Sequence, residues 1–141
     1  MEQSTKWATI KKYKTITNDI GVSVEPFYLD QESEPDDGHY VWGYQIHIEN
    51  HGKDTVQLER RHWIITDGNG KIHEVEGEGV VGEQPVLKPG GEYEYMSGAP
   101  LSTPSGFMEG RYKMKAADGS YFDVDIPAFS LDIPNDPRRL H

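Results

Sequence analysis

Residues 42–49 read Trp-Gly-Tyr-Gln-Ile-His-Ile-Glu, so large apolar side chains alternate with small or polar ones. Successive side chains of a β-strand point to opposite faces of a sheet, and this period of two therefore predicts a strand with one buried face. Residues 20–25 alternate in the same way, with Ile20, Val22 and Val24 as the apolar members. Two such strands indicate a sheet that covers a hydrophobic core on one side only.

Turn-forming residues separate further short runs of β-branched and aromatic residues. Asn-His-Gly at 50–52, Asp-Gly-Asn-Gly at 67–70, Pro-Gly-Gly at 89–91 and Asp-Gly at 118–119 are such turns, because Asn and Gly accept positive φ angles. The runs that they separate predict strands over residues 56–66, 71–75, 85–87, 92–97, 111–116 and 121–126, with an edge segment at 129–133. Helical periodicity free of Gly or Pro is absent from every window of eleven residues or more. The pattern predicts an all-β immunoglobulin-like or fibronectin-III-like antiparallel sandwich of seven or more strands.

The length of 141 residues fits one domain with one core. Three Trp, eight Tyr and four Phe indicate a packed interior, since disordered chains lack bulky aromatic residues. We expect residues 1–12 to form a flexible arm, residues 13–133 a single sandwich domain and residues 134–141 a tail.

The net charge of −10 disfavours nucleic acid and anionic membranes as partners, because binding to phosphates needs clustered Lys and Arg. Cysteine is absent, which excludes disulfides and thiol catalysis and fits a reducing cytosol. The first twelve residues lack the apolar segment of a secretory signal, and no apolar run is long enough to span a membrane. We therefore expect a cytoplasmic protein without membrane insertion, present as a monomer or weak homodimer.

Residues 77–82, Gly-Glu-Gly-Val-Val-Gly, match the G-x-G-x-x-G pattern of dinucleotide-binding folds. In those folds the glycines open a helix whose N-terminus holds pyrophosphate. Here Glu83-Gln84-Pro85 follows, which does not begin a helix, and Glu78 and Glu83 would repel phosphate. We interpret the segment as a loop or bulge between strands.

Two histidines, His62 and His73, flank the predicted hairpin at residues 67–70. A hairpin loop with an even residue count would place both on one face, near Glu76 and Glu78, where they could bind zinc or cobalt. An odd count would place them on opposite faces, and each could instead form ordinary hydrogen bonds. The acidic residues at 30–38 lack EF-hand spacing and are interpreted as a solvated loop.

Catalytic motifs are missing from the sequence. Ser97, Ser102 and Ser105 lie outside any G-x-S-x-G elbow, and no His-Asp pair has a recognisable position. We therefore expect no enzymatic activity and no cofactor. Phe107 and Met108 adjoin a turn and are the aromatic and apolar side chains that we expect to be exposed to a partner.

Five blocks of sequence, at residues 61–67, 75–85, 87–90, 95–98 and 106–112, resemble the bacterial ApaG family. The most specific of them are His-Trp-Ile-Ile-Thr-Asp at 62–67 and Gly-Val-Val-Gly-Glu-Gln-Pro at 79–85, and the resemblance extends over residues 13–133. It implies a fibronectin-III-like sandwich and an association with cobalt tolerance and magnesium efflux. Similar domains occur in eukaryotic F-box and polymerase-delta-interacting proteins, where the resemblance implies a role in protein contacts. No catalytic residues are established for the family, so the resemblance assigns none.

We therefore expect a non-enzymatic interaction domain with an unidentified protein partner, such as a transporter or regulator, that affects cobalt or magnesium handling. The contact surface that we expect consists of Gly77, Gly79, Val80, Val81, Gly82, Glu83, Gln84, Phe107 and Met108. One alternative is direct binding of a divalent metal or a phosphate-containing ligand at His62, His73 and the glycine-rich segment. A second alternative is a hydrolase that acts on a phosphorylated small molecule.

Overall fold

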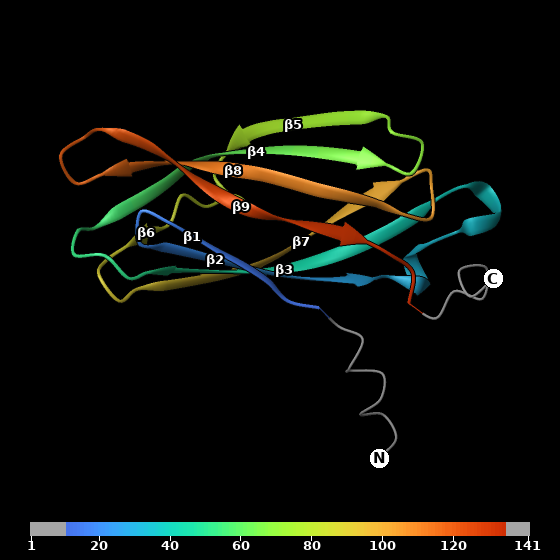
Figure 1. The fold of residues 1–141 in the computed structure, drawn as a ribbon, viewed down its shortest axis with the longest axis horizontal. Coiled ribbons are helices and arrows are strands. Elements are labelled where there is room, and N and C mark those ends of the chain that lie inside the picture. The colour runs from blue at the N-terminus through green and yellow to red at the C-terminus, as the bar shows by residue number, and fades with distance from the viewer. Residues whose placement is uncertain (1–10, 135–141) are drawn as a thin grey trace, which may run out of the picture.

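The structure, a computed structural model, describes residues 11–134 as nine strands in two antiparallel sheets that pack face to face (Figure 1). The strands are β1 (Tyr13–Thr17), β2 (Ile20–Tyr28), β3 (Tyr40–Asn50), β4 (Val56–Asp67), β5 (Ile72–Glu78), β6 (Val86–Leu87), β7 (Glu92–Leu101), β8 (Gly106–Ala116) and β9 (Tyr121–Leu131). One sheet has the order β1-β2-β3-β7 and the other β5-β4-β8-β9, with β6 paired to β4. The predicted all-β sandwich is confirmed.

Some elements differ from the sequence prediction. Strand β1 was not predicted; it joins β2 through Asn18 and Asp19, whose φ angles are 48° and 67°. The expected edge segment at 129–133 is instead, up to Leu131, the end of β9. The acidic loop contains two single turns of 3₁₀ helix, at Asp30–Glu32 and Pro35–Asp37. Apart from residues 11, 12 and 134, the expected arm over 1–12 and tail over 134–141 lie outside the described residues.

The predicted buried face of β3 forms the centre of the core. Trp42, Tyr44, Ile46 and Ile48 are each less than 5% exposed. The Tyr44 ring lies 5.3 Å from that of Trp63 on β4 and 5.7 Å from that of Phe129 on β9, measured between centroids. Aromatic contacts of this kind add to the free energy of burial and join the two sheets.

Opposite sides of the sandwich differ in how the sheets meet. At one side β1 lies against β9, where the Tyr13 hydroxyl hydrogen-bonds Ser130 at 3.1 Å and the Asp125 amide donates to Thr17 at 3.2 Å. At the other side the end strands are β7 of one sheet and β5 and β6 of the other. The glycine-rich segment lies on this second side, because it joins β5 to β6.

A β-bulge at Glu59 decides which residues of β4 face the core. Leu58 pairs with Met114 and Arg60 with Lys113 on β8, so Glu59 is an extra residue without a partner in this ladder. An extra residue reverses the alternation of side chains beyond it. Arg61 therefore lies on the inner face, opposite the buried Tyr112, and His62 on the outer face.

Two buried tyrosines join the sheets through their hydroxyl groups. Tyr95 of β7 and Tyr112 of β8 are hydrogen-bonded at 2.5 Å, and Tyr112 is completely buried. Burial raises the pKa of both hydroxyls well above the ordinary value, since the charged form would lose its hydration. Both tyrosines are therefore neutral over the physiological range.

We expect Tyr112→Phe to lower the free energy of unfolding by about 1–3 kcal/mol, because the Tyr95 hydroxyl would stay buried without its partner. The double variant Tyr95→Phe/Tyr112→Phe should lose less than the sum of the two single variants, since it leaves no unpaired hydroxyl. Urea unfolding of the four proteins measures this coupling. Strictly additive losses would show that the hydroxyl pair does not contribute.

Alkaline pH should destabilise the fold through the same pair. The folded-state pKa values of Tyr95 and Tyr112 lie above the ordinary value of 10.0. Their contribution is therefore complete below about pH 10 and is lost as the pH rises further, because the unfolded chain releases these protons first. Unfolding curves above pH 10 should show a steeper loss of stability for the native chain than for the double Phe variant. Equal slopes would contradict the assignment.

Candidate functional site

The glycine-rich segment is tied to the bulge in β4. The carbonyl oxygen of Glu59 accepts hydrogen bonds from the Gly79 amide at 2.7 Å and from the Gln84 side chain at 3.0 Å. Gln57, on the other side of the bulge, donates to the Gln84 carbonyl at 3.1 Å. The bulge thus provides the acceptor that holds both ends of the segment.

Arg61 fixes the segment from the inner face. Its Nη1 donates to the carbonyl oxygens of Glu78 at 3.0 Å and Gly79 at 2.8 Å. The guanidinium lies directly against Gly77, where an added Cβ would be 2.8 Å from Nη2. Glycine at position 77 therefore leaves room for the guanidinium in this position.

A tight turn forms the tip of the segment. The Val80 amide donates to the Glu83 carbonyl at 2.8 Å, and the Glu83 amide donates to the Val80 carbonyl at 2.9 Å. The two central residues, Val81 and Gly82, have φ angles of 42° and 84°, which is a type I′ turn. Glycine suits this conformation, whereas a β-branched residue in it is an outlier. Val81 is nonetheless there, with 54% of its surface exposed.

No phosphate cradle forms at this segment. It connects β5 to β6, as the loop interpretation predicted, and no helix begins at Gly82. The amides of Gly79, Val80 and Glu83 are already used in hydrogen bonds within the chain. The features that hold pyrophosphate in dinucleotide folds, a helix N-terminus and free amides, do not occur together here.

Exposed apolar side chains lie along the edge of β4 that pairs with β5 and β6. This edge pairs first with β5, opposite Arg60–Thr66, and then with β6, opposite Val56 and Gln57. The exposed fractions along it are 59% for Ile72, 42% for Val75, 54% for Val81 and 56% for Val86. Half of the eight large hydrophobic side chains exposed among residues 11–134 therefore lie in this stretch of chain.

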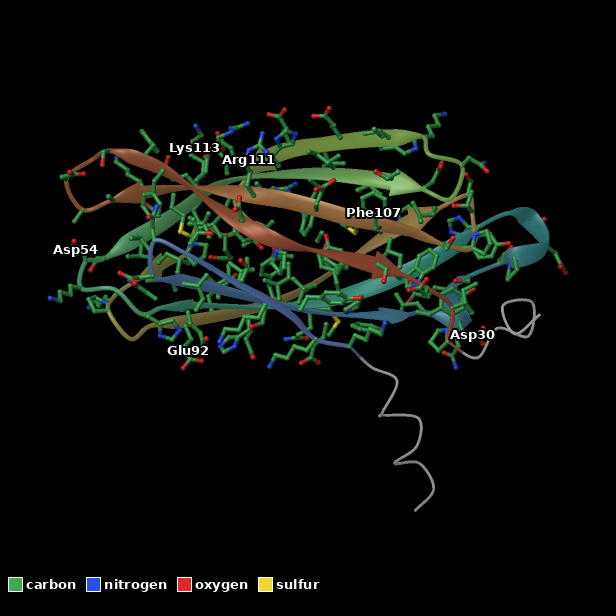
Figure 2. All side chains as sticks on the ribbon, in the orientation of Figure 1. Asp30, Asp54, Glu92, Phe107, Arg111 and Lys113 are labelled. Carbon is green, nitrogen blue, oxygen red and sulfur yellow. The ribbon has the colours of Figure 1, made fainter. Side chains whose placement is uncertain are left out.

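The other part of the expected contact surface lies elsewhere. Met108 is 1% exposed and faces the core opposite Ile65, so the expectation that it is exposed was wrong. Phe107 is 41% exposed on the outer face of β8 (Figure 2). Phe107 pairs with Thr66 of β4, whereas Glu78, where the glycine-rich segment begins, pairs with Arg60. Phe107 and the glycine-rich segment are therefore separated by six residues along β4, or about 20 Å. They do not form one continuous surface.

The two histidines considered as metal ligands are not brought together. Five residues, 67–71, lie between the paired positions Thr66 and Ile72, and this odd count places His62 and His73 on opposite faces. His62 Nε2 lies instead 2.8 Å from Glu74 and 3.8 Å from Glu76 on the outer face of β5. A shallow cleft there is lined by His62, Glu76, Asp123 and four basic residues, Arg60, Arg61, Arg111 and Lys113. Figure 2 shows Arg111 and Lys113 on this side of the molecule.

A second histidine cluster was not found from the sequence. His47 and Glu49 on β3 and Glu92 on β7 offer ligand atoms that all lie within 4.8 Å of one another. Burial acts to raise the pKa of Glu49, but a hydrogen bond from Lys14 and the charges of Lys14 and His47 bring it below the ordinary value. The alternation in residues 42–49 places His47 and Glu49 on one face, whereas Glu92 joins them only through the register of β3 with β7.

The acidic loop at 30–38 remains a solvated segment in the structure. All of its carboxylates are exposed, and neither of the His–Glu clusters found among residues 11–134 includes them. Within the same residues, none of the helices is long and apolar enough to cross a membrane.

Comparison with known proteins identifies the family. The family model described as ApaG domain matches residues 30–116. Protein ApaG of Paramagnetospirillum magneticum is 60% identical over 92% of this chain and 99% of its own length, and that of Brucella anthropi is 58% identical over the same shares. The crystal structure of a putative ApaA protein from Bordetella pertussis is 44% identical, with a TM-score of 0.79 over 87% of this chain and 97% of its own. The C-terminal domain of wzt, with 10% identity and a TM-score of 0.52 over 89% of this chain and 80% of its own, shares the fold alone. These matches confirm the resemblance seen in the sequence, and the chain belongs to the ApaG domain family.

Proposed function

We propose that this chain is a non-catalytic protein-interaction domain, whose partner acts in the handling of divalent cations such as cobalt and magnesium. The observation that carries the proposal is the conformation of Val81, an exposed apolar residue held in the left-handed region. We call residues 79–85 the docking loop. Strained backbone of this kind costs about 1–3 kcal/mol and persists where the surrounding structure enforces it, often at binding sites.

The docking loop is held in one conformation before a partner arrives. Arg61, Glu59 and Gln57 contribute hydrogen bonds from β4, and the Val80 side chain is buried in the core with 1% exposure. A loop that is ordered in advance loses little conformational entropy on binding, so its contacts contribute more fully to affinity. Val86, which pairs with Gln57 on the outer face of β4, adds a second exposed aliphatic side chain directly after the loop, whereas Val75 pairs with Trp63 and lies on the inner face.

The buried titratable groups support a non-catalytic role. Burial raises the pKa of Tyr44, Tyr95 and Tyr112, but these hydroxyls lie within the sandwich, whereas catalytic groups with shifted pKa values lie in clefts. The buried Asp67 accepts hydrogen bonds from the amides of Asn69 and Lys71 and stabilises its own turn. For the phosphate-hydrolase alternative, the docking loop offers no cradle that would hold a substrate.

The link to divalent cations comes from the family resemblance. Under this proposal the domain affects cobalt or magnesium efflux indirectly, by binding a transporter or a regulator through the docking loop. A partner that carries an apolar side chain or pocket opposite Val81 fits this surface best, because the loop presents aliphatic groups next to the carboxylate of Glu83.

We expect Val81→Asn to separate binding from folding. Asn-Gly is the preferred pair in a type I′ turn, so the free energy of unfolding should stay constant or rise by up to about 1–2 kcal/mol. Partner capture should fall about tenfold, which corresponds to the loss of about 1.4 kcal/mol of contact energy. Tagged protein incubated with cytosolic and membrane fractions, with and without cobalt, followed by quantitative mass spectrometry, measures the capture.

Ile16→Asn is the matched control. Ile16 is 60% exposed on β1, at the far side of the sandwich, so its replacement removes a similar apolar area without touching the docking loop. In a bacterial strain that loses cobalt tolerance without its own ApaG protein, the Ile16 variant should restore growth on cobalt and the Val81 variant should not. Equal capture and equal growth for both variants would refute the proposal.

A further inference from the structure

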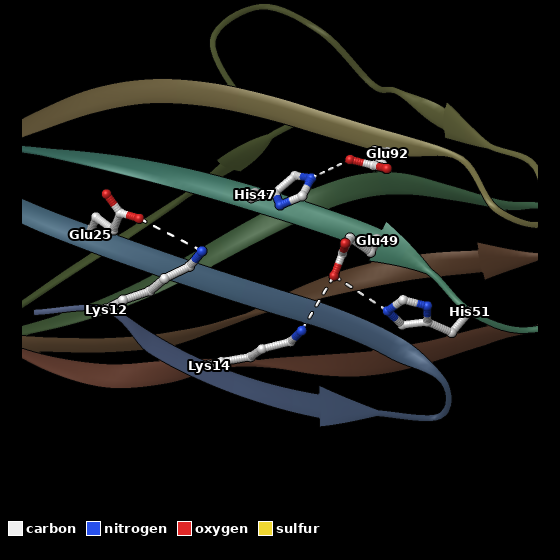
Figure 3. Close-up of polar contacts among 7 residues, drawn as sticks. All are labelled: Lys12, Lys14, Glu25, His47, Glu49, His51 and Glu92. Carbon is white, nitrogen blue, oxygen red and sulfur yellow. Dashed lines mark hydrogen bonds and ion pairs between the residues drawn. The ribbon is translucent and has the colours of Figure 1, made fainter.

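The outer face of β3 and β7 carries a compact group of imidazoles and carboxylates (Figure 3). His47 and Glu49 lie two residues apart on β3 and therefore share this face. Glu92 is the direct cross-strand partner of Glu49 on β7, and Glu94 is that of His47. The positions are fixed by the hydrogen-bonded ladder, which holds side chains more accurately than a loop does.

The register places two like charges opposite each other. Glu49 and Glu92 form a direct cross-strand pair, an arrangement that is destabilising for two carboxylates. Each carboxylate has an imidazole beside it: His47 Nε2 donates to Glu92 at 2.6 Å, and His51 Nε2 donates to Glu49 at 3.3 Å. Lys14 Nζ lies 3.4 Å from the same oxygen of Glu49. A cation between the two carboxylates would remove their repulsion.

The donor atoms match a particular class of cation. Imidazole nitrogen and carboxylate oxygen together favour zinc and the neighbouring divalent transition metals, whereas magnesium prefers oxygen ligands alone. On metal binding, Nε2 of His47 would give up the proton that it now shares with Glu92, and this proton would pass to solvent. Position 21, beside Glu49 on β2, is glycine, so only backbone underlies the space next to His51 and Glu49.

We propose that His47, Glu49 and Glu92 form a binding site for a divalent transition-metal ion such as Zn²⁺, with His51 as the fourth ligand. The imidazole nitrogen of His47 and the carboxylate oxygens of Glu49 and Glu92 already lie within 4.8 Å of one another, so binding needs only side-chain rotations. The site shares no residue with the docking loop and does not depend on the function proposed for that loop.

The second cluster, His62 with Glu74 and Glu76, is less suited to a cation. Its cleft is lined by Arg60, Arg111 and Lys113, whose positive charges oppose a metal ion. At the cluster of His47, Glu49 and Glu92, the lysine or arginine that forms an ion pair among residues 11–134 is Lys14, which contacts Glu49. Its side chain is 48% exposed and can rotate into solvent. The two clusters therefore serve as site and matched control in one experiment.

The test is calorimetric titration of the full-length chain with Zn²⁺ after removal of any histidine tag. We expect one tight equivalent per chain, with Mg²⁺ giving no comparable heat. His47→Ala and Glu92→Gln should each weaken Zn²⁺ binding at least about tenfold, because even the loss of a residue that only supports a metal ligand costs about that much. His62→Ala, Glu76→Gln and Val81→Asn should bind as the native chain does. Thermal unfolding without metal verifies that each variant is folded, and Zn²⁺ should raise the midpoint of every protein that keeps the site.

Three results would overturn the proposal. One is the absence of a tight Zn²⁺ equivalent in the native chain. Another is tight binding that survives both His47→Ala and Glu92→Gln. The third is a loss that follows His62→Ala and Glu76→Gln, which would assign the metal to the other sheet.

Discussion

One extra residue in β4, Glu59, is the constraint on which both the interior and the docking loop depend. Without a bulge, the inward position of Leu58 would place Arg61 and Trp63 on the outer face, since they are separated from it by odd numbers of residues. The bulge turns Trp63 into the core, where it meets Tyr44 and Phe129, and turns Arg61 toward the loop carbonyls. It also leaves the Glu59 carbonyl free to accept from Gly79 and Gln84. A single insertion thus connects the packing of the sandwich with the conformation of its most unusual loop.

The glycine motif of this chain has a structural explanation that does not involve phosphate. Gly77 allows the Arg61 guanidinium to lie against the backbone, and Gly79 has a φ angle of 64° with no room for a Cβ beside the Glu83 carbonyl. Gly82 completes the type I′ turn. The same spacing that opens a helix in a dinucleotide fold therefore serves here to fold a loop tightly onto β4, with Val81 at its tip. Both exposed His–Glu clusters, by contrast, depend only on strand register across the two outer faces.

The sequence was sufficient for the architecture and for part of the site. Alternation in residues 42–49 correctly identified the buried face of β3. Glu83-Gln84-Pro85, which does not begin a helix, correctly predicted that the glycine-rich segment connects two strands. Three features needed the exact register of strand pairing, which the sequence does not show: the five-residue hairpin that separates His62 from His73, the inward position of Met108, and the approach of Glu92 to Glu49. The bulge had one signal, because Leu58 and Trp63 are both large and apolar yet an odd number of residues apart. The hairpin between β1 and β2 was missed because Asn18-Asp19 lacks the glycine that marks most such turns.

The central claim is that the glycine-rich segment is an anchored connection between strands, with its amides already committed. Amide hydrogen exchange followed by NMR tests this residue by residue. The amides of Gly79, Val80 and Glu83 should be protected to a degree similar to those of β4, whereas Val81 and Gly82, which donate no backbone hydrogen bond within residues 11–134, should exchange rapidly. Rapid exchange at all five positions, or loss of these amide signals on addition of pyrophosphate, would contradict the claim.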